Sequence, residues 1–230
     1  MPHFRPFLSF GLENYQEHQV CSIAVGVVGD ICRALEGKFA PYCDEIIVLL
    51  LRNLQNPKFS RTVKPSILSS FGDIALAIEG QFEKYLDATM QMLQQASRTE
   101  ASSLEGSLSH SEAHLEYLSE LREAIFEAFT GVLQGLKASN KGNLFEPYML
   151  TVAELLQRVE QESTHNPPSD ELIRAAVGAA GDLGSVVPRF KSLAHQPEYK
   201  GPIMKLIKEA CRSSEEATAQ VGRWATSVIY

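Results

Sequence analysis

Apolar residues recur every three to four positions along most of the chain, which is the spacing of one face of an α-helix. They form one such stripe in the segment 39–55 and another in the segment 62–80. The stretch NPKFSR between the two segments is rich in turn-forming residues, and Gly80 follows the second stripe where a helix end is expected. The pattern therefore predicts a unit of helix, turn and helix, and it indicates no β-strand.

This unit recurs along the chain. Nine of the sixteen residues from Gly29 to Asp44 are identical to their counterparts 43 positions later, from Gly72 to Asp87. A third related stretch, AVGAAGDLG, lies at 176–184. A period of this length is typical of two-helix repeats, which cannot bury their apolar faces alone and therefore stack into an elongated array. We expect an all-α fold, an α-solenoid with a superhelical array of about five repeats.

The repeats divide residues 1–230 into a single array. The expected units, with approximate boundaries, cover residues 1–37, 38–80, 81–137, 143–188 and 196–230. The third unit is longer than the others because the Ser- and Gly-rich stretch 98–112 interrupts it as an insertion loop. The array can continue past the insertion, since surface loops tolerate added residues.

The charge of the chain narrows the classes of partner. Its 230 residues carry a formal net charge of −7, which disfavours a nucleic-acid partner and favours a basic protein or peptide. The longest apolar run, IIVLLL, is too short to cross a bilayer, so we expect no membrane span. The four cysteines contain no CxxC pair, and we expect them to be buried thiols rather than disulfides or metal ligands.

Three aspartates follow a glycine in the second helices of their repeats, namely Asp30, Asp73 and Asp182. Aspartate is unfavourable within a helix, so its recurrence needs a reason. One hypothesis is a structural ladder of hydrogen bonds between stacked helices, which the adjacent glycine allows to approach closely. The other is an acidic rung that meets a basic ligand. The structural hypothesis is favoured, because Asp73 lies at the flank of the apolar stripe, beside the neighbouring helix.

No group of residues predicts an enzyme. The aspartates have no second acid, base or nucleophile at a matching spacing, and the chain contains neither a phosphate-binding loop nor a dinucleotide-binding motif. His110 and His114, in HSEAH, have the helical spacing of a metal-binding pair but not the arrangement of the HExxH motif. We therefore expect no catalytic residue, no metal site and no cofactor, and we interpret the two histidines as a surface coincidence.

A row of glutamates in the third unit is the better candidate for binding. The row falls within a sector of about 80° on one helix, opposite the apolar residues. It consists of Glu112, Glu116, Glu120, Glu123 and Glu127. Residues 101–130 contain six glutamates and one arginine, so most of the net negative charge of the chain is concentrated there. Two interpretations are open at this point: the solvated face of an ordinary helix, or a surface for a basic ligand.

Several stretches resemble a known family. VKPSILSSFGDIA looks like the second helix of a HEAT repeat. QVCSIAVGVVGDICRAL, ELREAIFEAFTGVLQGLK and the closing RWAT resemble, in order, the C-terminal end of importin beta (karyopherin beta), the family of nuclear import receptors. The resemblance extends over nearly the whole chain. It implies terminal HEAT repeats that act in protein import, in the cytoplasm, in the nucleus and at the pore of the nuclear envelope. It also implies that most of the site for the small GTPase Ran lies elsewhere in the full-length receptor.

The resemblance assigns partners to the candidate residues. It implies that the glutamate row, on the concave face, binds the basic helix of importin alpha or a basic cargo. It implies that Trp224, in RWAT, stacks on that helix through a cation–π contact, although core packing of the last repeat explains this tryptophan equally well. On the convex face it implies grooves for Phe-Gly repeats of nucleoporins, where Ile47 and Leu51 are candidates beside a role in packing between repeats. An alternative function is a HEAT scaffold subunit that holds other proteins in a complex.

Overall fold

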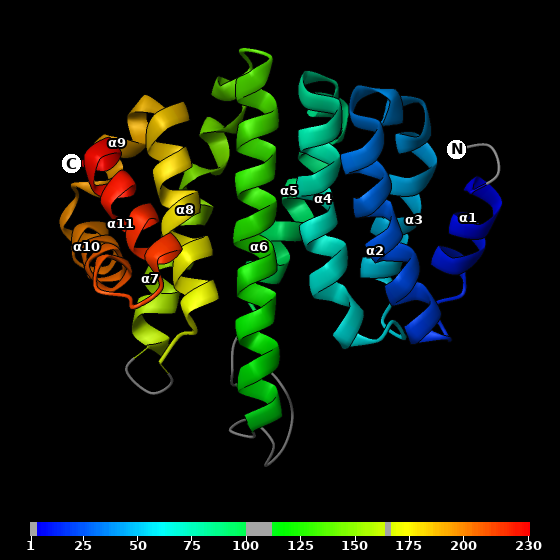
Figure 1. Cartoon of the computed structure of the whole chain (residues 1–230), viewed down its shortest axis with the longest axis horizontal. Helices are drawn as coiled ribbons and strands as arrows, with labels where there is room; N and C mark the ends of the chain where they lie inside the picture. The colour runs from blue at the N-terminus through cyan, green and yellow to red at the C-terminus, as the bar shows by residue number, and fades with distance from the viewer. Residues whose placement is uncertain (1–3, 100–111, 164–166) are drawn as a thin grey trace.

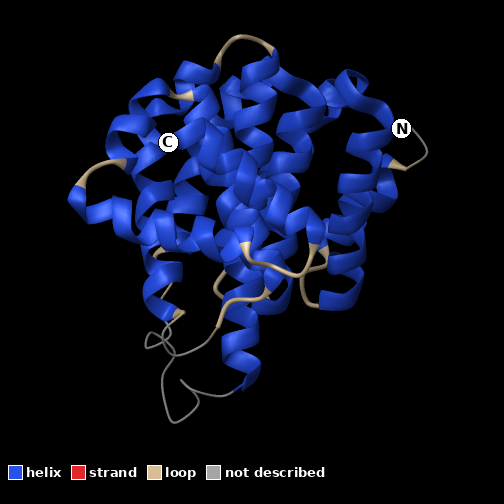
Figure 2. Cartoon of the chain, turned by 60° about the vertical axis from the view of Figure 1, so that its left-hand side comes forward, coloured by secondary structure: helices blue, strands red, loops and turns tan. Residues whose placement is uncertain are grey.

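The computed structural model describes residues 4–99, 112–163 and 167–230, and these residues form helices and connections without a strand (Figures 1 and 2). The α-helices are α1 Arg5–Glu13, α2 His18–Leu35, α3 Cys43–Gln55, α4 Lys64–Ile78, α5 Glu83–Ser97, α6 Glu112–Ala138, α7 Met149–Glu162, α8 Asp170–Val186, α9 Pro188–Ala194, α10 Pro197–Cys211 and α11 Glu216–Ile229. The expected all-α fold is therefore confirmed. The short helix α9 was not expected from the sequence, and it begins with Pro188 at a position where proline is well tolerated.

The helices form two layers. The second helices of the pairs, α2, α4, α6, α8 and α11, lie side by side in one layer, with the first helices α3, α5 and α7 behind them (Figure 1). The second helices contact one another along much of their lengths, whereas most neighbouring first helices meet at few points. A layer that packs more tightly than its partner becomes the inner side of a curved array. The second helices therefore line the concave face.

Glycines allow the closest approach within the inner layer. A Cβ atom at Gly131 of α6 would lie 2.5 Å from the Cα of Gly72 in α4, so the two backbones touch at this point. A Cβ at Gly135 would overlap the main chain of Ala75, one turn further along both helices. Only glycine fits where two helix backbones meet in this way. The small residues thus set the spacing of α4 and α6, the most extensive helix pair of the array.

The first two repeats end in the same unusual backbone conformation. Glu36 after α2 and Glu79 after α4 both have a φ of 49°, a value that L-residues other than glycine seldom adopt. Each is followed by glycine, Gly37 or Gly80, and by a 3₁₀ segment, Glu36–Tyr42 or Glu79–Phe82. The sequence predicted the second of these helix ends at Gly80 itself. The turn instead begins one residue earlier, because the glutamate takes the positive φ.

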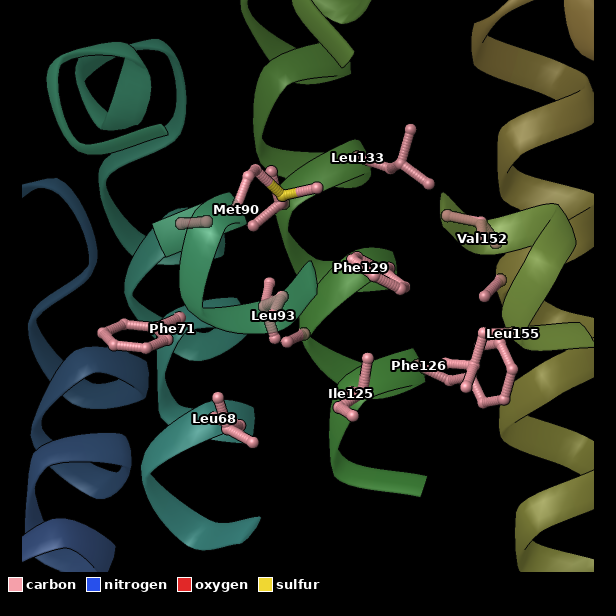
Figure 3. Close-up of a cluster of buried hydrophobic side chains, with 14 of the residues drawn as sticks. Leu68, Phe71, Met90, Leu93, Ile125, Phe126, Phe129, Leu133, Val152 and Leu155 are labelled. Atoms are coloured by element: carbon pink, nitrogen blue, oxygen red, sulfur yellow. The ribbon is translucent and has the colours of Figure 1, made fainter. Parts of the chain in front are cut away.

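One apolar core runs through the array from α1 to α11. Figure 3 shows part of it, where side chains of α4, α5, α6 and α7 lie together between the layers. The labelled residues are Leu68, Phe71, Met90, Leu93, Ile125, Phe126, Phe129, Leu133, Val152 and Leu155, all of them buried. Three of the four cysteines are also buried, but Cys211 is exposed, so the expectation of a buried thiol is wrong at that position.

Candidate partner-binding surfaces

The glutamate row lies on the middle helix of the concave layer. Glu112, Glu116, Glu120 and Glu127 are exposed and Glu123 is half-buried, all on α6. The apolar residues on the opposite side of α6 are buried in the core. The row therefore presents several carboxylates to solvent along one face of α6. This helix packs between α4 and α8, and its N-terminal part projects beyond them (Figure 1).

The surroundings of Glu123 and Glu127, in the C-terminal part of this row, disfavour the charged form of their carboxyl groups. Surrounding helices partly desolvate Glu127, and this desolvation, followed by repulsion from Glu123 and Asp73, raises the pKa of its carboxyl. Desolvation and then repulsion from Glu171 also raise the pKa of Glu123. Arg174 of α8 opposes both shifts. Acidic groups from α4, α6 and α8 thus converge on one region of the concave face. Arg174 is the one cation among the residues that shift the pKa values of Glu123 and Glu127.

The Gly-Asp carboxylates connect neighbouring second helices. Arg33 of α2 donates one hydrogen bond to Asp30, at 2.8 Å, and another across to Asp73 of α4, at 3.0 Å. Gln134 of α6 donates to Asp182 of α8, at 3.0 Å. Asp182 is 7% exposed, and this burial raises the pKa of its carboxyl. These hydrogen bonds are the kind that a structural ladder requires, although the three aspartates do not bond to one another.

Trp224 lies at the contact between α8 and α11. Its six-membered ring rests directly on Gly181, where a Cβ atom would overlap it, yet the residue remains 37% exposed. Arg223 is held by Glu216, 2.5 Å away, in an ion pair on its own helix. The tryptophan therefore packs against the neighbouring repeat and keeps part of its surface accessible, so the structure does not decide between the two roles expected for it.

The residues proposed for the convex grooves are placed less favourably. Ile47 is 1% exposed, so it belongs to the core and cannot line a groove for a ligand. Leu51 is partly buried against the core. The packing of α1 and α5 decides which faces of α3 are covered. The apolar pattern of α3 alone does not show where these two helices pack.

A better apolar hollow lies at the edge of the array between the second and third repeats. It has a volume of about 240 Å³ and is lined by Leu54, Arg61, Lys64, Leu68, Met92, Gln95, Ala96, Thr99, Tyr117 and Leu121. The guanidinium of Arg61 lies 5.2 Å from the centre of the Tyr117 ring, which places a cation beside the apolar lining. No single segment of the sequence predicts this hollow, because its walls come from α3, α4, α5 and α6.

The residues considered for metal binding are not arranged as a metal site. His114 is buried in α6 rather than on the surface, so the interpretation as a surface coincidence is wrong for this residue. His110 lies outside the described residues. Within the described ranges, no group of three or more His, Cys, Asp or Glu side chains is arranged to hold a metal ion. Among the same residues, no helix is both long and apolar enough to cross a membrane.

Comparison with known sequences defines the family. A family described as "Importin subunit beta-1-like, TPR repeats" matches residues 1–211. The importin subunit beta-1 proteins of Schizosaccharomyces pombe and Arabidopsis thaliana are each 38% identical to the chain over 231 aligned positions. The matches cover 100% of this chain but only 26% and 25% of those relatives. The chain is an all-helical α-solenoid, and it belongs to the importin beta family.

Solved structures agree with this assignment. A crystal structure of importin beta in a polyethylene glycol condition has a TM-score of 0.88 and 34% identity, with 100% of this chain and 27% of that chain covered. The yeast protein Kap95p matches with a TM-score of 0.84 in a complex described as Kap95:Nup1, at 28% identity over 99% of this chain and 25% of that one. Another Kap95p structure, with a TM-score of 0.84 and 29% identity over 99% of this chain and 25% of that one, describes Kap95p binding to RanGDP. The expected placement in the C-terminal region of the receptor is not upheld by the comparisons.

Proposed function

We propose that this chain is part of a nuclear import receptor and that its concave face binds a basic helical segment, such as the helix of importin alpha or a basic cargo. The observation that carries the proposal is the exposed glutamate row on α6, at the centre of the concave layer. Membership of the importin beta family supports the same function. In this proposal the receptor works in the cytoplasm, in the nucleus and at the nuclear pore.

The dimensions of the row suit a helical ligand. Its five glutamates extend over sixteen residues of α6, and the rise from the first to the last is about 22 Å at 1.5 Å per residue. A basic helix of similar length could place a lysine or arginine near each carboxylate. The desolvation and mutual repulsion that raise the pKa of Glu123 and Glu127 also favour a cation there, because a bound positive charge relieves the repulsion. A HEAT scaffold subunit, the alternative, has no need of this concentration of charge.

The test is to change all five glutamates of the row to glutamine. A labelled helical peptide rich in lysine and arginine should bind the native chain more tightly in low salt than in high salt. The five-glutamine variant should bind at least about tenfold more weakly in low salt and lose most of the salt dependence. Lowering the pH should also weaken binding to the native chain but not to the variant, since the raised pKa values of Glu123 and Glu127 let these carboxyls become neutral at a higher pH than usual.

A matched control has the same change in net charge at other places. Five glutamates that are exposed, lie away from α6 and make no side-chain hydrogen bond or ion pair within the described residues are Glu13, Glu17, Glu154, Glu198 and Glu215. Their replacement by glutamine should leave binding of the basic peptide within about twofold of native. Equal losses in both variants would show that net charge alone attracts the peptide. Unchanged affinity in the α6 variant would refute the role of the glutamate row.

A second binding surface, for the Phe-Gly repeats of nucleoporins, is supported by the hollow between the second and third repeats. Its volume of about 240 Å³ lies below the usual range of pockets for drug-sized ligands and suits one large side chain. A relative has been solved as a Kap95:Nup1 complex, which favours this class of partner. Ran also remains a partner of the whole receptor in this proposal, as the RanGDP structure of the relative suggests.

Met92→Glu should weaken binding of a Phe-Gly peptide by about tenfold, since a carboxylate would then stand in an apolar wall of the hollow. Val48→Glu, at an exposed apolar residue of α3 outside the hollow, is the control and should bind like the native chain. Fluorescence anisotropy in high salt measures the apolar contact with little electrostatic contribution. Equal affinity of the native chain and Met92→Glu would exclude this hollow as the Phe-Gly site.

A further inference from the structure

A second hollow lies nearer the C-terminal end of the array, between the start of α8 and the side of α10. It has a volume of about 700 Å³ and is lined by Asp170, Ile173, Gly201, Met204, Lys205, Lys208, Glu209, Arg212 and Ser213. The two helices pack against each other there (Figure 1). The lining differs from that of the concave face, because cations outnumber acids and stand beside the apolar side chains of Ile173 and Met204.

The cations of this hollow come from one side of α10. Lys205, Lys208 and Arg212 are separated by three and four residues, so they fall within about 60° around the helix axis. Like charges at this spacing repel one another and weaken the helix slightly. A bound anion would relieve this repulsion.

Within the described residues, two of the three cations have no side-chain partner. Lys205 bonds to Glu160 at 2.7 Å, which leaves little of its charge for a ligand. Lys208 and Arg212 are exposed, and neither forms a side-chain hydrogen bond or an ion pair within the described part of the chain. Asp170, at the end of the hollow, already accepts hydrogen bonds from Ser213 and Thr218. It is thus occupied by its own neighbours and does not neutralise the two free cations.

We propose that the hollow between α8 and α10 binds an acidic peptide segment of a partner protein. Carboxylates of the peptide pair with Lys208 and Arg212, and an apolar side chain of the same peptide lies between Ile173 and Met204. A nucleic acid fits less well, because two unpaired cations can match only a few of the closely spaced phosphates of its backbone. This surface is separate from the glutamate row, so the inference does not depend on the function proposed for the concave face.

The probe is a labelled twelve-residue peptide with two glutamates on either side of a Leu-Phe pair, extended by glycine and serine. It should bind the native chain in low salt, and the double variant Lys208→Glu with Arg212→Glu should bind it at least about tenfold more weakly. Lys38→Glu with Lys58→Glu changes the net charge equally at two exposed lysines far along the chain, and it should keep native affinity. Because all four residues are exposed, the variants should fold, as circular dichroism can verify.

Two further peptides and a nucleic acid separate the possible outcomes. A peptide with glutamine in place of glutamate should not bind, and one with alanine in place of Leu-Phe should bind more weakly than the original. Equal binding of the original peptide to the native chain and the double variant would overturn the proposal, and so would an equal loss in the control variant. Tighter binding of a twelve-nucleotide single-stranded RNA than of the peptide, through the same two residues, would assign the hollow to nucleic acid instead.

Discussion

A Gly131→Ala variant is expected to be less stable than the native chain by about 3 kcal/mol, at the upper end of the usual cost of overpacking an interior. The added Cβ would lie 2.5 Å from the Cα and 2.6 Å from the carbonyl oxygen of Gly72. Both atoms belong to the main chain of α4, so no side-chain rotation can relieve the overlap. The helices α4 and α6 must move apart, and the core between them (Figure 3) must loosen.

Gly26→Ala is the matched control for this variant. Gly26 also lies within a second helix, α2, but a Cβ atom there would meet nothing within 4 Å. Because alanine has the higher helix propensity, this variant should be more stable by up to about 1 kcal/mol. Thermal unfolding followed by circular dichroism compares the two, with about 2–4 °C for each kcal/mol in a chain of this size. If Gly131→Ala unfolds at or above the native midpoint, the backbone contact does not limit the spacing of the helices.

The repeats could be predicted from the sequence because their information is local. Each helix pair carries its own apolar stripe, and the stripe of 62–80 gave a correct set of core residues, Val63, Ile67, Phe71, Ile74 and Ile78. The recurrence of Gly29-Asp30 as Gly72-Asp73 then fixed the length of the unit. The division into five units stays a prediction, since helix pairs in a continuous core have no sharp boundaries.

Surfaces assembled from several repeats could not be predicted in the same way. The pattern of α3 shows two apolar rows, but it does not show which row the neighbouring helices cover, and Ile47 was assigned to the wrong one. The hollow near Met92 has walls from four helices, so no single segment reveals it. The basic row of α10 is different, because the spacing of Lys205, Lys208 and Arg212 is readable from the sequence. The net charge of −7, however, favours acidic rather than basic residues as candidates for binding.

The single arginine among the glutamates of α6 shows the same limit of sequence analysis. Arg122 is 1% exposed, and it donates hydrogen bonds to both carboxylate oxygens of Glu162, each at 2.6 Å, and to the carbonyl of Thr99, at 3.2 Å. It thereby joins α6 to the last residue of α7 and to the end of α5. The side chain of Glu162, in contrast, is 36% exposed. Arg122 without Glu162 would be a buried charge with no counter-ion, whereas Glu162 without Arg122 would still be in contact with water.

Glu162→Ala should destabilise the chain by about 3 kcal/mol, because it leaves the buried guanidinium of Arg122 without its counter-ion. Arg122→Met should cost less than about 1 kcal/mol, since methionine fills much of the space and Glu162 can then turn to water. The control, Glu216→Ala, breaks the exposed pair with Arg223 and should change stability by less than about 0.5 kcal/mol. Urea unfolding measures the three variants. If Arg122→Met unfolds at a lower urea concentration than Glu162→Ala, the prediction is wrong. The loss of the buried guanidinium would then cost more than leaving that guanidinium without its counter-ion.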